Sequence, residues 1–361
     1  MENTSILDNL TPVKVIPAFS TVAEDALYTV ASVEESYTNI MKEIGIYELS
    51  LVMEGKDEDT KKKLDLKAIF TKFKETAQSL WQKFIGLVQT ARDRVEALII
   101  SKVKDLKSLK LTDKDLKDAI TNASDWKKLS VLKFDDSVSG ALITKMNHAI
   151  DQVKAKIDAL KEDQDAVVEI NVEGIVAGIL AGSYGKASIK VTEADVKSAS
   201  DFKAKLVEAL VTNLVDEDTA DKAKAKIVEN FGDIYGALGK SKADFDKSLK
   251  DSYKSCKTKV DTSIKEAKKA ADKGKLKAFK PMFKSLSQTV KLYSIAVGAI
   301  ETAYIKVSAD KFRVLLAAAT LALKARKDAE KAAEEVVNNS ADITAMESTT
   351  FQTELKSLFT F

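Results

Sequence analysis

The sequence predicts a mainly α-helical protein, an elongated helical bundle with long coiled-coil-like helices and a small α+β insert near residues 166–191. The 361-residue chain contains only three prolines and 13 glycines, so long stretches have no helix-breaking residue. In several of these stretches apolar residues recur at alternating spacings of four and three, as on one buried helix face. Near 166–191, by contrast, β-branched residues and glycines gather, which favours short strands.

The length predicts two to three globular units, because a typical domain has about 150 residues. Hydrophobic residues make up 45% of the chain and charged residues 31%, the composition of a folded globular protein. Breaks in the helical pattern divide the chain into an N-terminal arm (1–20), an N-terminal helical bundle (21–162), a central small α+β segment (163–239), a long helical hairpin or coiled coil (240–340) and a C-terminal tail (341–361).

The first helices are predicted from caps and periodicity. Thr21 is a candidate N-cap for a helix over about 22–53. The clearest amphipathic stretch follows, with a heptad seam formed by Leu66, Phe70, Phe73, Ala77, Leu80, Phe84, Leu87 and Ala91. Further apolar residues widen this face, so the helix is expected to pack in a bundle. Thr112 and Ser137 are candidate N-caps of two shorter helices.

The central insert differs because β-branched residues flank a group of glycines. Val167–Val172 and Ile189–Val191 are expected to form strands. Residues 182–188, GSYGKAS, are similar to a phosphate-binding P-loop, but Leu180 and Ala187 replace its first glycine and its magnesium-binding hydroxyl. We therefore expect a glycine-rich turn here and no nucleotide site.

Three more helices are expected after the insert. One starts at Ser198–Asp201 and runs through Leu214, and the next covers about 219–235. The third has a longer seam, formed by Phe245, Leu249, Tyr253, Cys256, Val260, Ile264, Ala267 and Ala271. Cys256 is thus expected to be a buried, unreactive thiol, since no neighbouring His or Arg activates it.

The last helix is the longest signal in the sequence. Pro281 separates it from the preceding helix, and its apolar residues keep four-three spacing from Leu286 to Val307. The spacing resumes after Lys311, and the helix is expected to extend to Val337 and to stop at Asn338–Ser340. Charged residues interrupt every window of 18 residues, so no transmembrane helix is expected.

Charge is distributed in blocks, although the net charge is only +2. Residues 1–59 carry a net charge of −9 and residues 134–239 one of −7, whereas 60–133 and 240–284 carry +9 each. We expect segments of opposite sign to neutralise one another within the chain. The alternative is a basic face for nucleic acid, whose candidate contacts are Lys247, Lys250, Lys254 and Lys257. Because the chain has only four arginines, DNA contact would be nonspecific.

Residues that most enzymes need are scarce. Cys256 is the only cysteine and His148 the only histidine, which excludes a disulfide framework and most zinc sites. His148 lies outside the seam of its helix and is expected to be an ordinary, partly exposed residue. The usual nucleophile, zinc-protease, dinucleotide and calcium motifs are missing, and no acid lies in an apolar setting that would shift its pKa. We expect no enzyme activity, no cofactor, no metal site and no small-molecule substrate.

Three stretches together resemble the internal or head-associated structural proteins of large tailed bacteriophages. They are the aromatic and basic helix (64–91), the strand-like piece that runs into a helix (184–210) and the long terminal seam (291–331). The resemblance implies a non-enzymatic structural protein of the virion, made in the host cytoplasm. Its partners would be other virion proteins and further copies of itself. The N-terminal residues agree in lacking the apolar core of a secretory signal.

Two other functions compete with this one. A helical, membrane-active protein of the pore-forming kind would insert Gly174–Gly185 with its flanking β-branched runs, but that stretch is about half the length needed to span a bilayer, and a membrane partner is not expected. A nonspecific DNA-binding packaging protein would use the two +9 blocks, and its affinity would fall steeply with salt.

Overall fold

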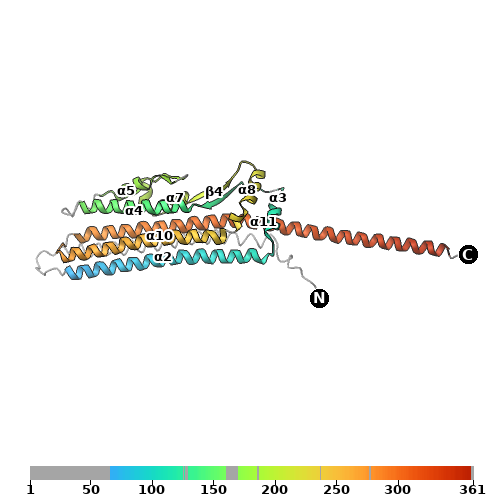
Figure 1. Ribbon diagram of the computed structural model, residues 1–361, viewed down its shortest axis with the longest axis horizontal. Coiled ribbons are helices and arrows are strands. Elements are labelled where there is room, and N and C mark those ends of the chain that lie inside the picture. Colours follow the sequence, from blue (N-terminus) through green and yellow to red (C-terminus); the bar gives the residue numbers. More distant parts are fainter. Residues whose placement is uncertain are drawn as a thin grey trace.

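The computed structural model describes residues 66–124, 126, 129–159, 170–184, 187–235, 237–275 and 278–358. The expected N-terminal arm, the helix expected at 22–53, the first residues of the strand expected from Val167 and the last three residues of the tail lie outside this part. Within it the protein is mainly helical, as predicted, with two small two-stranded sheets. Figure 1 shows the long helices lying side by side along the longest axis of the molecule.

Three long helices lie side by side: α2 (Leu66–Ser108), α10 (Ala237–Asp272) and the N-terminal part of α11 (Phe279–Leu358). We call these three the rod. Each of them packs against the other two. Helix α4 (Asp136–Ala159) lies against α10 and α11 (Figure 1). The rod thus combines segments from both ends of the described chain, and several of the described elements between α2 and α10 pack against it.

The seam predicted for α2 is confirmed from Phe73 onward. Phe73 and Phe84 are fully buried, while Leu66 and Phe70 at the helix start are half-buried. The ring of Phe73 packs against that of Phe283 in α11, with centroids 4.5 Å apart. Fully burying a large apolar side chain contributes about 1.5–3 kcal/mol, so a few such contacts are enough to hold α2 against α11.

Helix α11 is the central element of the fold. All residues from Leu292 to Ile300 are buried, so α11 is enclosed on every side over about two turns. The ring of Tyr304 lies 4.8 Å from that of Phe245 in α10 and 6.0 Å from that of Phe134 at the end of strand β1. A helix enclosed in this way is expected to be apolar on all sides. A charged residue within it loses water, and this costs free energy unless a hydrogen bond or an opposite charge compensates.

The end of α11 differs from the expectation. Its backbone continues through Asn338–Ser340 to Leu358, so the stop expected there was wrong. Asn and Ser each lower helix propensity by less than about 0.7 kcal/mol, and no glycine or proline follows Gly298. Pro281 lies in the first turn of α11, where a missing N–H is tolerated. Figure 1 shows the C-terminal part of α11 extending beyond all the other described elements.

The described elements from β1 to α9 form what we call the insert, which packs along one side of the rod (Figure 1). Besides α4 it contains β1 (Ser130–Phe134), α5 (Val172–Leu180), β2 (Gly182–Tyr184), β3 (Ala187–Ile189), α6 (Glu193–Lys197), α7 (Ala199–Leu210), β4 (Val211–Asp216), α8 (Ala220–Glu229) and α9 (Phe231–Tyr235). The small α+β insert predicted near residues 166–191 is present as α5, β2 and β3.

The strands of the insert correct two expectations. β1 pairs antiparallel with β4, so Leu214 belongs to a strand and not to the preceding helix. Val172 begins helix α5, whereas Ile189 lies in β3 as expected, in a hairpin with β2. Short apolar runs fit a helix or a strand equally well, and the partner that selects a strand at β4 lies about 80 residues earlier in the chain. The glycine-rich turn is the β2–β3 hairpin, entered through Gly182 at φ 108°.

The helix caps are local features, and the structure bears out one of the two predicted early caps. Thr112 and Asp115 form a capping box at the start of α3 (Asp113–Asn122). At α4 the capping residue is Asp135 and not Ser137, because the Asp135 carboxylate accepts the backbone N–H groups of Ser137 at 3.1 Å and Val138 at 3.2 Å. The Ser137 hydroxyl donates to the same carboxylate.

Candidate functional site

Three charged residues of α11 lie inside the protein: Glu301, Asp310 and Lys311, none more than 6% exposed. We call them the buried charge row. Burying a charge costs several kcal/mol unless hydrogen bonds or an opposite charge offset the loss of water. Each member of the row lies near a different element of the insert: α7, β1 or α9.

Glu301 is fully buried, and neither of its carboxylate oxygens accepts a hydrogen bond from any residue that the structure describes. Arg94 of α2 and Lys203 of α7 act on this carboxyl electrostatically and favour its ionised form. Burial outweighs both cations and raises the pKa of Glu301 to about 7. Lys203 is itself buried, at 6% exposure. Glu301 therefore changes its charge near neutral pH.

The other two members of the row make direct hydrogen bonds to the insert. Asp310 Oδ2 accepts the backbone N–H of Leu132 in β1 at 2.8 Å. Lys311 Nζ donates to the backbone carbonyl of Asp233 in α9 at 3.1 Å. Burial is the main cause that lowers the pKa of Lys311. The buried charge row thus connects α11 to α7, β1 and α9.

A separate polar network joins α11 to α4 and α10. The hydroxyl of Tyr293 donates to Asn147 Oδ1 in α4, and Asn147 Nδ2 donates to Ser255 Oγ in α10 at 3.2 Å. Burial raises the pKa of Tyr293 above its ordinary range. A phenol with a raised pKa and a satisfied hydroxyl is suited to holding three helices in register, not to acid–base chemistry at neutral pH.

Ion pairs between α4 and α10 bear on the expected neutralisation of charge. Lys259, from the basic block, pairs with Asp151, from the acidic block 134–239. Lys154 and Glu266 form a second pair between the same helices with the signs reversed. Both pairs join these two blocks, but only the Lys259–Asp151 pair has the signs that neutralisation of the basic block by the acidic block predicts. The other acidic block, residues 1–59, lies outside the described residues.

The candidate nucleic-acid contacts form one exposed face of α10, which we call the lysine face: Lys247, Lys250, Lys254 and Lys257. Lys257 is engaged within the chain, because its Nζ lies 2.6 Å from Asp261 Oδ2 and 5.9 Å from the centre of the Trp81 ring. The structure thus places the four residues on one face of one helix, and the side chains of Lys247, Lys250 and Lys254 are exposed to solvent.

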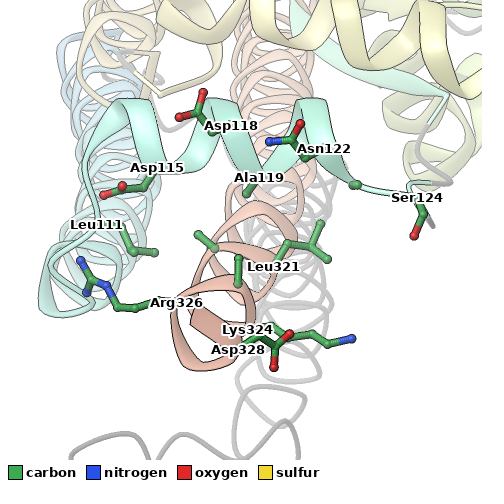
Figure 2. Close-up of a pocket in the computed structure, with 13 residues that line it drawn as sticks. Leu111, Asp115, Asp118, Ala119, Asn122, Ser124, Leu321, Lys324, Arg326 and Asp328 are labelled. Atoms are coloured by element: carbon green, nitrogen blue, oxygen red, sulfur yellow. The ribbon is translucent and has the colours of Figure 1, made fainter. Parts of the chain in front are cut away.

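A surface pocket of about 410 Å³ lies between α3 and α11, where α11 leaves the rod (Figure 2). Leu321 of α11 lies below Ala119 of α3 and gives the pocket an apolar wall. Its polar lining mixes signs: Asp115, Asp118, Asn122, Ser124, Lys324, Arg326 and Asp328. Because acids and bases both line it, the pocket has no electrostatic preference for an anion or a cation.

The structure also describes Cys256, His148 and most of the segment that is similar to a P-loop. Cys256 is fully buried, and burial raises the pKa of its thiol, which confirms the prediction of a core residue. His148 is exposed, outside the apolar side of α4. The segment that is similar to a P-loop belongs to the β2–β3 hairpin, so it lacks the strand–loop–helix arrangement that holds phosphates. Lys145 of α4 donates to the backbone carbonyl of Ala181 beside it at 3.2 Å.

Glu301 is the residue that sequence reasoning missed, since the absence of any acid in an apolar setting was wrong. The sequence around Glu301 nevertheless contains a sign that this residue is buried. Between Leu292 and Val307 only Glu301 and Lys306 are charged, and Glu301 lies seven residues after Ser294 and seven before Ser308. Both serines are buried, so these positions share one buried face of α11.

Comparison of the chain with protein-family models, with curated proteins and with solved structures finds no match. Among the described residues, no group of three or more Cys, His, Asp or Glu side chains could hold a metal ion. The same residues include no helix with an apolar stretch long enough to cross a bilayer.

Proposed function

We propose that this protein is a non-enzymatic structural protein of a bacteriophage virion, internal or head-associated. It would be made in the host cytoplasm and would act by assembling with other virion proteins and with copies of itself. Two things support the proposal. The segments 64–91, 184–210 and 291–331 resemble such proteins, and the architecture is a rod of long helices with one of them projecting beyond it.

The projecting helix is the observation that carries this proposal. Every residue from Lys324 to Glu334 is exposed, and Figure 1 shows α11 continuing beyond the other described elements. An isolated helix is marginally stable in water. Opposite charges spaced three apart, such as Lys327 with Glu330 and Lys331 with Glu334, add only about 0.2–0.5 kcal/mol per pair. A projecting helix of this kind gains stability when a partner covers it, which is the situation of an assembled particle.

The first experiment asks whether the protein is in the particle. Virions are purified by density-gradient centrifugation from a lysate in which this chain is produced, and their proteins are quantified by mass spectrometry. We expect the chain to sediment with the particles in a fixed ratio to the capsid protein. Particles that lack it, with the chain left in the soluble fraction, would refute the proposal.

The second experiment asks whether the projecting helix makes the assembly contact. Ala329→Pro interrupts the helix at an exposed position, seven residues beyond the buried Ala322, and costs about 3 kcal/mol of local helix stability. Ala329→Ser is the matched control, since it changes the same side chain and keeps the backbone N–H. We expect the proline variant to lose incorporation into particles and the serine variant to retain it. Equal incorporation of both would assign the contact to another surface.

Nonspecific DNA contact during packaging is a second candidate function, and one observation favours it. Lys247, Lys250 and Lys254 are exposed on one face of α10. A row of lysines can neutralise phosphates without reading bases, and its binding weakens steeply as salt rises. A variant in which all four residues of the lysine face are replaced by Gln separates this function from a purely structural one, because it removes the phosphate contacts without changing the buried side of α10.

The membrane-active alternative has less support from the fold. Val176 and Leu180 of α5 are fully buried, and α5 packs on α4 and α6. Insertion would therefore require the insert to come apart first. Ile179, which is only partly buried, is the better position for a test, because Ile179→Asp leaves the core of α5 intact. Leakage of liposomes that this variant abolishes would favour the membrane-active function.

A further inference from the structure

One side of α10 is basic along most of the helix. The lysine face continues toward the C-terminal end of α10 with Lys265, Lys268 and Lys269, which are also exposed, and we call the seven residues together the lysine stripe. Among the residues that the structure describes, Lys257 alone in the stripe has an ion-pair partner, Asp261 of the same helix. Lysines three or four residues apart on a helix repel one another, so the stripe favours a nearby anion.

The described part of the acidic block 134–239 forms its ion pairs with α10 on a different side. Helix α4, which belongs to that block, contacts α10 at Ser255, Lys259 and Glu266. At 3.6 residues per turn these positions lie roughly 130° around the helix from the middle of the stripe. The other acidic block is residues 1–59, with a net charge of −9.

Helices α2 and α10 run antiparallel, and this fixes where the N-terminal part of the chain enters the rod. The ring of Trp81 lies 4.9 Å from that of Tyr253. Farther along α2, Arg92 pairs at 3.3 Å with Asp246, which comes earlier in α10. Leu66, the first residue of α2, is therefore beside the C-terminal part of α10. Residues 1–59 thus enter the rod at the end of the stripe that carries Lys265, Lys268 and Lys269.

The acidic segment is long enough to follow the stripe to its other end. Lys247, the farthest lysine, is next to Asp246, and the partner of Asp246 in α2 lies about 40 Å along that helix from Leu66. The chain between Glu35 and Leu66 spans about 45 Å as a helix and about 100 Å when extended. Because this segment is tethered, its effective concentration at the stripe is on the order of millimolar, which a free polyanion must exceed.

We propose that the acidic segment 1–59 docks on the lysine stripe of α10 and shields it from nucleic acid and other polyanions. The contact is electrostatic and lies within one chain, so it weakens as salt rises but not as the protein is diluted. Its release would uncover the lysine face for phosphate contacts. This inference rests on the charge and placement of α10 and is independent of the virion proposal.

Carbodiimide cross-linking of the full chain, followed by peptide mass spectrometry, tests the docking. The reagent joins a carboxylate to a lysine ammonium only where the two are in contact. We expect cross-links from residues 1–59 to both ends of the stripe, with a yield that does not change on dilution. The Lys257–Asp261 pair within α10 is the internal control for the reagent.

Three results of this experiment would overturn the proposal. The first is the absence of cross-links between residues 1–59 and the stripe while the internal control is present. The second is a set of cross-links that ends at Lys265, Lys268 and Lys269, because the lysine face would then be uncovered. The third is a yield that falls on dilution, which would make a second copy of the chain the occupant.

Binding to a DNA duplex at low salt tests the shielding. The test variant replaces Glu34, Glu35, Glu43 and Glu48 by Gln. A face that is free only one time in ten binds about tenfold more weakly than an open one, so we expect this variant to bind DNA about tenfold more tightly than its control does.

The control carries Asp218→Asn, Asp328→Asn, Glu330→Gln and Glu334→Gln, which remove the same charge from exposed positions outside α10. Equal DNA affinities of the two variants would overturn the shielding. The gain should disappear when the seven lysines of the stripe are also replaced by Gln, and a gain that persists would overturn the assignment of the stripe. If the test variant does not fold, the cross-links of the wild type still decide whether the segment docks.

Discussion

Replacing Glu301 by Gln should stabilise the whole protein at alkaline pH and have little effect at acidic pH. Gln keeps the size of the side chain but removes its charge. The carboxyl is fully buried, so solvent does not screen it. The Gln amide also lacks hydrogen-bond partners, and this lowers the stability of the variant by the same amount at every pH. The cost therefore cancels when the stability of the variant is compared between two pH values.

The magnitude follows from the raised pKa of Glu301, about 7 in the folded protein against an ordinary 4.5. Below pH 4.5 both the folded and the unfolded chain hold the proton, and the group contributes no pH dependence. As pH rises toward 7 the unfolded chain releases its proton first, so stability falls. Above pH 7 the loss is complete and amounts to about 3 kcal/mol, of which about 2.5 kcal/mol accrues between pH 5 and pH 8.

Urea denaturation of the wild type and of Glu301→Gln at pH 5 and pH 8 measures this effect. The difference in the free energy of unfolding between the two proteins should move by about 2–3 kcal/mol in favour of the variant on going from pH 5 to pH 8. A difference that is the same at both pH values would show that Glu301 is hydrated or paired in the folded protein. The account of its burial would then be wrong.

Three further predictions test other parts of the structure. Leu87→Asp and Ile300→Asp each force a charge into the rod and should lower stability by at least about 3 kcal/mol in thermal unfolding, whereas Lys306→Asp at an exposed position should not. Cys256 should react with thiol reagents slowly in the folded protein and rapidly in denaturant, and equal rates would place it at the surface. Replacing the whole lysine face by Gln should leave helicity almost unchanged. We expect little change in DNA binding as well. A salt slope of log K that becomes less steep, by up to ~0.9 for each phosphate that the variant no longer neutralises, would instead support the packaging function.

Much of the helical part of the fold follows from local pattern. Apolar residues spaced alternately by four and three identify the buried faces of α2 and α11, because this spacing follows from 3.6 residues per turn alone. Phe73 and Phe84 of α2 and Val290 of α11 belong to these faces and are buried. The cap at Thr112 is equally local, since its hydrogen bonds reach only to Asp115. For the same reason the core position of Cys256 could be read from the sequence.

Long-range contacts account for most of what could not be predicted. β4 forms because β1 supplies its partner strand. The run Val211–Asp216 contains three β-branched residues, but it continues directly from a helical pattern, and without its partner so short a run does not separate a strand from a helix. The α4 cap moved from Ser137 to Asp135, a shift of two residues that helix-start signals do not resolve. The exposed lysine face, by contrast, follows from local pattern, because it lies on a different face of α10 from the predicted seam.

By itself, the sequence determined that this protein is helical, which face of each long helix is apolar and that its charge lies in blocks, since all three are properties of neighbouring residues. Only the tertiary structure decided that α11 is the helix enclosed by the others, and therefore that Glu301 is deprived of water. The physical reason is that a charge is stabilised or destabilised by everything within several ångströms of it. Here those surroundings include α2 and α7, which are distant from Glu301 in the chain and meet it only after folding.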